Sequence, residues 1–423
     1  MNKIINLKIF NNLLSRYQAL FFVVIVLVSF LRTPFLFLSP RFWAEEGTVY
    51  FAFAYNHSWV DTLSSIHMGY FSLFANLTAI LSAKIVPLEM APFISLLFSF
   101  IVQLLPIFVV IKGDSEFFKS DLQKIIIILL ILISPYNKEI WLNTIGSQFY
   151  LTLTVFLILL DNHKCLPRQT NIFYMFLLLF SGLSGILSCL FLPIFIYKYF
   201  IKRYKNTFLY VVILFSCLIF HLSYIFNMNN RILIYDYTFI PHIIFMKNIV
   251  FNVFGINLTT KIAENIMQYG SLGIFILGLL LWMIYLFLSV VFMKKDRYST
   301  VLFLGSYALI IIFCMLFSLE NNMTIMSYFI ACRYFFVPNI IILMFLLYHV
   351  RYLKRKLLIY GVYLFIMSSI YQGLILFPFD HYDHLKCPKW TDEIKKWKSD
   401  SAYQPIIPPV GWKLGNWRVR LKR

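Results

Sequence analysis

The residues best suited to chemistry are two adjacent carboxylates, Glu45 and Glu46, in the run FWAEEG at 42–47. They follow the first membrane-length apolar stretch, 19–38. A carboxylate in apolar surroundings is costly and has a raised pKa, which suits a general base. If the segment is an α-helix, Glu46 lies within an aromatic face and Glu45 on its rim, so we expect Glu46 to be the desolvated base. An interfacial helix with both acids turned toward water is the alternative interpretation.

A second group of polar residues, at 139–148, has the side chains that bind sugars. Glu139 and Asn143 stand one helical turn apart at a hairpin between two apolar stretches, and Gln148 follows them. A carboxylate and amides suit hydrogen bonds to sugar hydroxyls. The same side chains equally suit the capping of two short helices. The spacing alone does not separate these two interpretations.

Two arginines are candidates for binding a phosphate group. Arg333 stands at the outer end of an apolar stretch, and Arg41 precedes the acid pair. Guanidinium groups bind phosphate oxygens through paired hydrogen bonds. The alternative for Arg333 is ordinary snorkelling to lipid headgroups. Arg32, deep in the first apolar stretch, is costly there unless it is paired or snorkels.

The composition identifies the class of protein in which these residues act. Of the 423 residues, 61% are hydrophobic and 13% charged, and the mean hydropathy is +0.78, which excludes a soluble globular domain. Apolar runs of membrane-crossing length recur, without the alternation typical of barrel strands. We expect an all-α polytopic membrane protein with about nine crossings, at 19–38, 91–111, 125–140, 143–160, 208–226, 271–292, 300–318, 336–350 and 357–376.

The basic residues predict the orientation of the chain. Its net charge of +19 comes mainly from short clusters between apolar runs, which argues against a nucleic-acid partner. If the N-terminus is cytoplasmic, these clusters fall on the cytoplasmic side, as the positive-inside rule expects. An odd number of crossings then places the C-terminus in the periplasm. We expect a membrane domain at 1–377, with outer loops at 39–90 and 227–270, and a periplasmic tail at 378–423.

Two apolar stretches do not fit simple crossings. The segment 171–199 is broken at 181–185 and again at Pro193. Two half-helices that dip into the membrane and return fit this pattern, because broken backbone at membrane depth is tolerated where protein buries it. Two short crossings fit nearly as well. The stretch 69–86 ends at Pro87 and is expected to be an interfacial or partly inserted helix on the outer side.

The sequence lacks the usual motifs for nucleotides, dinucleotides, zinc proteases and esterases. The six cysteines show no C-x-x-C spacing and the histidines no metal-ligand spacing, so no cofactor is expected, and the need for a divalent metal stays open. The tail instead supplies tryptophans, Trp412 among them, whose rings suit stacking against a glycan. A belt of Trp and Lys at the membrane interface is an equally good interpretation.

Several of these motifs together resemble a known family, the serotype-converting glucosyltransferases (Gtr) of enterobacterial temperate phages. In related sequences the acid pair often reads Glu-Asp, whereas here it is Glu-Glu, which changes side-chain reach but keeps both carboxylates. The resemblance covers nearly the whole chain and depends on motifs in the same order: the run at 41–47, the hairpin of Glu139, Asn143 and Gln148, the break at 182–185, the run RYFF at 333–336 and the closing PIIPPVGW at 405–412.

The resemblance implies a GT-C-like enzyme of the bacterial inner membrane that modifies O-antigen. Undecaprenyl-phosphate glucose is then the expected donor, and a sugar of the lipid-linked O-antigen polysaccharide, on the periplasmic face, the acceptor. Glu45 or Glu46 is expected to deprotonate the acceptor hydroxyl, and Arg333, or else Arg41, to stabilise the departing lipid phosphate. The hairpin residues and Trp412 are expected to bind sugar. A donor-synthesising glucosyltransferase and a flippase are expected partners.

Two other classes of function also fit a basic, polytopic chain. A flippase for lipid-linked sugars, or a polysaccharide transporter, predicts repeated halves with broken crossings, and no internal repeat is evident. A membrane O-acyltransferase acting on the same glycan predicts a catalytic histidine, and none stands out in this sequence.

Overall fold

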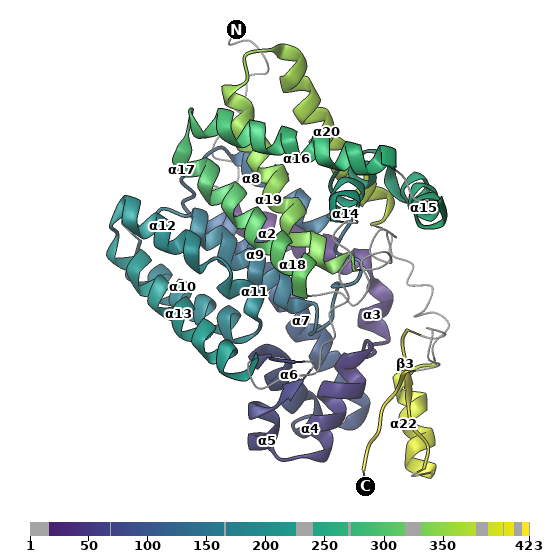
Figure 1. Ribbon diagram of the computed structural model, residues 1–423. Helices are drawn as coiled ribbons and strands as arrows, with labels where there is room; N and C mark the ends of the chain where they lie inside the picture. The colour runs from purple at the N-terminus through teal and green to yellow at the C-terminus, as the bar shows by residue number, and fades with distance from the viewer. Residues whose placement is uncertain are drawn as a thin grey trace.

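The computed structural model describes residues 17–67, 69–164, 166–225, 240–269, 272–317, 331–377, 388–400, 402–409 and 417–422, and most of these are helical (Figure 1). Within those ranges, six helices are long and apolar enough to cross a membrane: Leu88–Lys112, Lys205–Tyr224, His242–Ile266, Arg297–Met315, Arg333–Tyr352 and Lys356–Ile375. The chain is therefore an α-helical membrane protein.

The elements of the first part of the chain are mostly short. They are α2 (Gln18–Arg32), α3 (Pro34–Leu38), the π-helix η2 (Glu46–Phe51), α4 (Ala52–Asn56), α5 (Trp59–Ser64), the strands β1 (Ile66–His67) and β2 (Tyr70–Phe71), α6 (Leu73–Lys84), η3 (Leu88–Met90), α7 (Ala91–Lys112), α8 (Asp121–Leu132) and α9 (Ser147–Leu160). The strands β1 and β2 pair antiparallel, with Ile66 opposite Phe71.

The second part contains most of the long helices. Its elements are α10 (Arg168–Leu183), α11 (Ile186–Cys189), α12 (Leu192–Lys202), α13 (Lys205–Ile225), α14 (Ile240–Phe245), η5 (Met246–Val250), α15 (Phe251–Tyr269), α16 (Leu272–Met293), α17 (Arg297–Thr300), η6 (Val301–Gly305), α18 (Ser306–Phe317), α19 (Arg333–His349), η8 (Val350–Tyr352), α20 (Lys356–Ile375), α22 (Trp390–Ser399), β3 (Ile406–Ile407) and β4 (Trp417–Arg418). β3 and β4 form a second antiparallel pair.

Several expected crossings have different bounds in the structure. The expected helix 19–38 is interrupted at Thr33, whose backbone (φ −142°, ψ 60°) is not helical; a residue that precedes proline disfavours the α-helical conformation. The expected crossing 125–140 ends at Leu132, and 143–160 begins only at Ser147. Between them, an irregular segment at 133–146 carries Glu139 and Asn143, and Gln148 lies in the first turn of α9.

The expected outer loop 227–270 is helical, not irregular, in the described part of its second half. Residues 240–269 are helical with a kink at Gly255, and His242–Ile266 is a candidate crossing. This helix was not expected from the sequence because it contains polar residues. In the structure these side chains are buried and hydrogen-bonded: Asn252 Nδ2 donates to Asn339 Oδ1 at 2.8 Å, and Asn248 Nδ2 to the hydroxyl of Tyr307 at 2.5 Å. Residues 226–239 lie outside the described ranges.

The segment 171–199 folds as a helical hairpin with a break at Ser184 and Gly185. Its two ends lie together, because Tyr174 in α10 and Lys198 in α12 both hydrogen-bond to Asp161, at the end of α9. Its turn lies at the other end of α9, where Gly185 packs against Gln148. The hairpin therefore extends along the whole of α9, and both interpretations, re-entrant or two short crossings, share this geometry.

Arg32 is a buried structural clamp. Its guanidinium donates to Leu132 O at 2.8 Å and to Asn137 Oδ1 at 2.7 Å, and it lies 4.1 Å from the ring centroid of Trp141. The side chain is 4% exposed, so it does not snorkel. It fixes the end of α2 to the irregular segment 133–146, as a buried cation with polar partners should.

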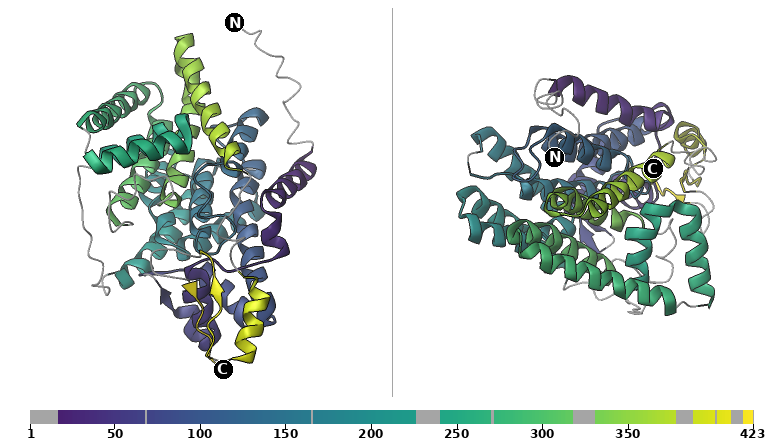
Figure 2. Two further views of the ribbon diagram at one scale, coloured as in Figure 1. Left: turned by 90° about the vertical axis from the view of Figure 1, so that its right-hand side faces the viewer. Right: turned by 90° about the horizontal axis from the view of Figure 1, so that it is seen from above.

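One end of the molecule collects the short elements and the tail. Figure 1 shows α22 and β3 beside α4, α5 and α6 at this end, and Figure 2 shows the same grouping from the side. The indole Nε1 of Trp390 donates to Leu88 O at 2.8 Å, and Lys398 pairs with Glu89 at 2.6 Å. The expected outer loop 39–90 and the described parts of the tail therefore share one face.

Gly373 allows α20 to pack directly on the end of α8. A Cβ atom at Gly373 would lie 1.6 Å from Ile133 O, whereas a Cβ at Gly361, on the same helix, would meet nothing within 4 Å. We expect Gly373→Ala to lower the free energy of unfolding by about 1–3 kcal/mol or more. Gly361→Ala should leave it unchanged or raise it slightly, because alanine favours helix. Thermal unfolding in detergent measures both, and equal melting temperatures for the two variants would contradict this packing.

Candidate functional site

The acidic run at 42–47 forms a tight turn into η2. Ala44 has a left-handed φ of 44°, and Glu46 begins the π-helix. Phe42 is fully buried, and its ring stacks on Phe51 at 4.3 Å. A Cβ at Gly47 would lie 2.6 Å from the Ile407 side chain, so glycine permits the tail to approach the run this closely. The backbone here is therefore fixed from both sides.

Glu46 bridges two segments that are far apart in the sequence. Its Oε2 accepts from the backbone N–H of Trp43 at 2.9 Å, and its Oε1 from that of Thr144 at 2.8 Å. The side chain is 3% exposed, and burial raises its pKa from 4.5 to about 7, although both backbone hydrogen bonds act in the opposite direction. Because both oxygens hold backbone donors, Glu46 is placed to support the turn.

Glu45 is the acid whose charge reaches a polar cluster formed by Arg333, Glu139, Tyr70 and Gln148. It is partly exposed, and its negative charge acts on both Arg333 and Tyr50. The expectation that Glu46 is the base depended on α-helical phase, and the left-handed Ala44 and the π-helix break that phase. The desolvated acid is Glu46, as expected, and Glu45 is the more exposed of the two.

Arg333 and Glu139 form an ion pair. Arg333 Nη1 lies 2.8 Å from Glu139 Oε1, and its backbone N–H donates to Oε2 at 3.2 Å. The Arg333 side chain is 37% exposed, so the pair lies at a surface that a ligand can reach. The residue expected to bind phosphate and one expected to bind sugar are thus partners, and they join α19 to the segment 133–146.

Asn143 and Gln148 differ in their surroundings. Asn143 is buried, its Oδ1 accepts from the Gly146 N–H at 2.6 Å, and its Nδ2 donates to Glu139 O at 3.0 Å, as the capping interpretation expects. Gln148 is partly exposed and donates to the hydroxyl of Tyr70 at 3.3 Å. Tyr70 in turn interacts with Arg333. Gln148 therefore belongs to the polar cluster, and Asn143 holds the loop.

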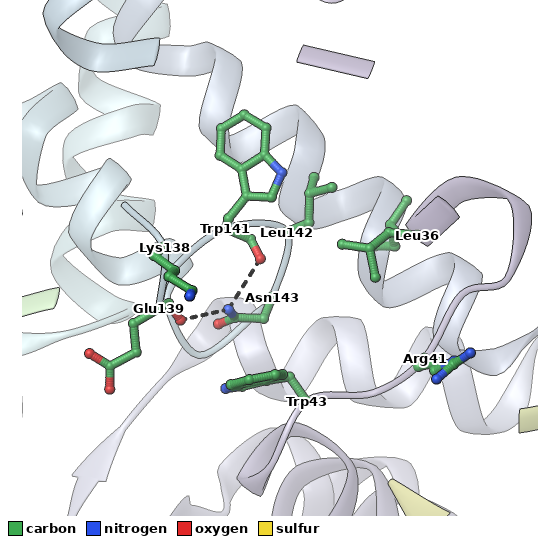
Figure 3. Close-up of a pocket in the computed structure, with 9 residues that line it drawn as sticks. Leu36, Arg41, Trp43, Lys138, Glu139, Trp141, Leu142 and Asn143 are labelled. Atoms are coloured by element: carbon green, nitrogen blue, oxygen red, sulfur yellow. Dashed lines mark hydrogen bonds between the residues drawn. The ribbon is translucent and has the colours of Figure 1, made fainter. Parts of the chain in front are cut away.

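A hollow adjoins the segment 138–143 (Figure 3). Its empty volume is about 300 Å³, open solvent included. In Figure 3 the amide of Asn143 bonds to the backbone of its own loop, the ring of Trp43 lies along one side, and Arg41 lies at the edge far from Lys138. The lining residues are Leu36, Arg41, Trp43, Leu96, Lys138, Glu139, Trp141, Leu142 and Asn143.

The sequence analysis missed three residues of this region: Tyr70, Lys138 and Lys247. Lys247 is fully buried, its Nζ lies 4.0 Å from Cys332 Sγ, and the charge of Glu139 acts on it. Lys138 had been placed inside an expected crossing, Lys247 in an expected loop and Tyr70 in an interfacial stretch. The adjacent charges of Lys138 and Glu139, inside an expected crossing, were the sequence signal that could have indicated a polar site there.

The described tail residues pack against the acidic run; two of their tryptophans are buried and Trp417 is half-buried. Trp390 and Trp397 are 2% and 6% exposed, which corrects the expectation that their rings are free for a glycan. Trp390 lies edge-on to Phe42 at 5.2 Å, and Pro408 O accepts from the Ala44 N–H at 2.8 Å. Trp412 lies outside the described residues. The tail thus packs against one side of the turn at 42–47.

Among the described residues, no group of three or more His, Cys, Asp and Glu side chains could hold a metal ion. What the site does assemble is a half-exposed carboxylate, a carboxylate–guanidinium pair and a tyrosine–glutamine pair, at one end of an α-helical membrane protein. Comparison of the chain with protein-family models, with curated proteins and with solved structures finds no match in any of the three.

The buried Glu46 gives a pH-dependent stability. Since its folded-state pKa, about 7, exceeds the usual 4.5, the folded chain holds this proton more tightly than the unfolded chain does. Its contribution is complete below pH 4.5 and is lost as the pH rises through 7, by roughly 3 kcal/mol. Glu46→Gln cannot ionise, so its melting temperature relative to the wild type should rise between pH 5 and pH 8. Glu89→Gln is the control, and parallel curves for Glu46→Gln and the wild type would contradict a buried, titrating Glu46.

The tail contact is tested by removing its main anchor. Trp390→Ala deletes a buried indole and should weaken the docking of the tail by about 3 kcal/mol. We expect faster cleavage within the tail by a soluble protease in limited proteolysis of the detergent-solubilised chain. Trp59→Ala is the matched control because Trp59 is 52% exposed. Equal cleavage rates in the two variants would show that Trp390 does not hold the tail.

Proposed function

We propose that this chain is a membrane glycosyltransferase that moves glucose from undecaprenyl-phosphate glucose to a sugar of the lipid-linked O-antigen. The observation that carries the proposal is the convergence of Glu45 and the Arg333–Glu139 pair at one end of the helical bundle. Transfer from a lipid phosphate requires a base for the acceptor and a cation for the leaving group. The motif resemblance to the serotype-converting glucosyltransferases names the substrates.

In the proposed reaction, Glu45 takes the proton from the attacking acceptor hydroxyl. The bond between the anomeric carbon and the phosphate oxygen breaks through an oxocarbenium-like transition state, and the new glycosidic bond forms. The electron pair of the broken bond leaves with the polyprenyl phosphate, whose added charge Arg333 stabilises. Glu46 holds the turn that aims Glu45, and Glu139 compensates the charge of Arg333 before the donor binds.

The proposal includes an orientation and a cellular setting. The basic clusters support a cytoplasmic N-terminus, which puts the end that carries Glu45 and the tail in the periplasm of a bacterial inner membrane. The overall plan is then GT-C-like, with the donor supplied by a separate glucosyltransferase and carried across by a flippase. Gln148 and Tyr70, next to Arg333, are placed to contact sugar hydroxyls.

The test compares O-antigen from cells with and without the chain by mass and linkage analysis. We expect a gain of one hexose per modified repeat with the wild type, and a loss of about 100-fold or more in transfer with Glu45→Gln. Glu89→Gln, which changes another carboxylate at the same end, should retain activity. An acetyl shift would instead favour an O-acyltransferase, and full hexose transfer by Glu45→Gln at normal protein levels would exclude Glu45 as the base.

A further inference from the structure

Two turns that are far apart in the sequence meet at one end of the helical bundle. One joins α16 to α17, and the other joins α19, through η8, to α20. Asp296 in the first turn accepts hydrogen bonds from the hydroxyls of Tyr348 and Tyr352, at 2.9 and 3.1 Å. Arg351 Nη2 lies 3.5 Å from the same carboxylate. Because α19 begins at Arg333, the joined turns lie at the opposite end of that helix from the candidate site.

The joined turns carry a strong excess of positive charge. Residues 290–300 and 345–360 contain one carboxylate, that of Asp296, which is paired with Arg351. Glu116, whose charge acts on Tyr298 in α17, is itself paired with Lys198 and Lys202. The two turns also carry six exposed basic side chains, which we call the basic surface: Lys294, Lys295, Arg297, Lys354, Arg355 and Lys356.

Three of these cations stand where folding does not favour them. Lys354, Arg355 and Lys356 lead directly into the N-terminus of α20, whose first turn contains no acidic residue. The N-terminus of a helix carries partial positive charge, so cations beside it raise the free energy of the folded chain and a bound anion lowers it. An anion from outside the chain would therefore balance both the basic side chains and the helix dipole.

Exposed apolar side chains border the basic surface on both long helices that leave it. Val290 and Met293, near the end of α16, are 53% and 42% exposed, and Leu357 and Leu358, at the start of α20, are 81% and 52% exposed. In a membrane protein, such exposed apolar patches contact the acyl chains of lipids. A soluble anion would cover the cations only, whereas an anionic lipid would cover the cations and the apolar border together.

We propose that the basic surface binds the headgroup of an anionic phospholipid of the surrounding bilayer. The lipid phosphate lies among the cations of the two turns, and the acyl chains lie against the apolar residues of α16 and α20. Because the headgroup contacts both turns, it stabilises their contact through Asp296 and Arg351. The surface is separate from the candidate site and depends on neither the proposed function nor the orientation of the chain.

The experiment measures binding of phosphatidylglycerol to the full, detergent-solubilised chain by native mass spectrometry, with phosphatidylcholine and inorganic phosphate as separate probes. We expect phosphatidylglycerol to bind more tightly than either. The triple variant Lys354→Gln, Arg355→Gln, Lys356→Gln should weaken it by about 10- to 100-fold, because each basic residue near an anionic membrane surface contributes about fivefold. The double variant Lys294→Gln, Lys295→Gln should weaken it from the other turn. Lys354→Arg with Lys356→Arg keeps the charge and should retain the affinity.

A matched control removes three exposed cations from other turns at the same end of the bundle: Lys164→Gln, Arg168→Gln and Lys205→Gln. Those turns lie at the end of α9, where the backbone N–H of Glu116 donates to Leu160 O and the neighbouring ring of Phe117 packs on Tyr348. The control should bind phosphatidylglycerol as the wild type does. Without lipid, the triple variant should melt no lower than the wild type, since it loses cations that oppose the dipole of α20.

Each outcome decides the proposal. Undiminished binding of phosphatidylglycerol to either the triple or the double variant would overturn a headgroup site shared by the two turns. Equal weakening in the matched control would mean a diffuse attraction to all basic turns and would overturn it as well. Equal affinity for phosphatidylcholine would mean contact with acyl chains alone, and equal affinity for inorganic phosphate a site for free anions, and both would reject the anionic lipid. Weakening confined to the two variants of the basic surface, with retention by the arginine variant, would support it.

Discussion

One buried carboxylate determines whether the candidate site exists. Glu46 accepts the backbone N–H of Trp43 with one oxygen and that of Thr144 with the other, and so joins two segments that are far apart in the sequence. Glu45 is the neighbour of Glu46 on the first segment, and Glu139 lies on the second. The relative positions of the proposed base and of the ion pair with Arg333 therefore follow from the geometry of this one side chain.

Buried and half-buried cations perform a similar task elsewhere in the chain. Arg32 donates to a carbonyl at the end of α8, Lys198 to Leu159 O at the end of α9, and Lys124 to Gly113 O just beyond α7. The last carbonyls of a helix lack partners within the helix and carry partial negative charge, so a cation is favourable there. Some of the basic residues that indicate membrane orientation, such as Lys124 and Lys198, thus also hydrogen-bond to carbonyl groups at the C-terminal ends of helices.

The helical membrane class was predictable from the sequence, because hydropathy and run length depend only on local composition. The helix at 240–269 was not, because Asn248 and Asn252 look polar in the sequence and become satisfied only through Tyr307 and Asn339, far along the chain. The acid pair was identified from the sequence because two adjacent carboxylates follow a membrane-length apolar stretch. The burial of Glu46 was predicted correctly, although the α-helical phase on which that prediction depended is broken by Ala44 at φ 44°.

The closure of the tail over the acidic run determines when the site can form during synthesis. Asn56 Nδ2 donates to Arg420 O, a partner 364 residues later in the chain. Chains emerge from the ribosome N-terminus first and fold as they emerge, so the run at 42–47 is made long before Trp390, Ile407 and Pro408. The turn at 42–47 gains its contacts with the tail only when Trp390, Ile407 and Pro408 have packed against it. Assembly of the site is thus a late folding event, and a chain released early would carry the acid pair without its support.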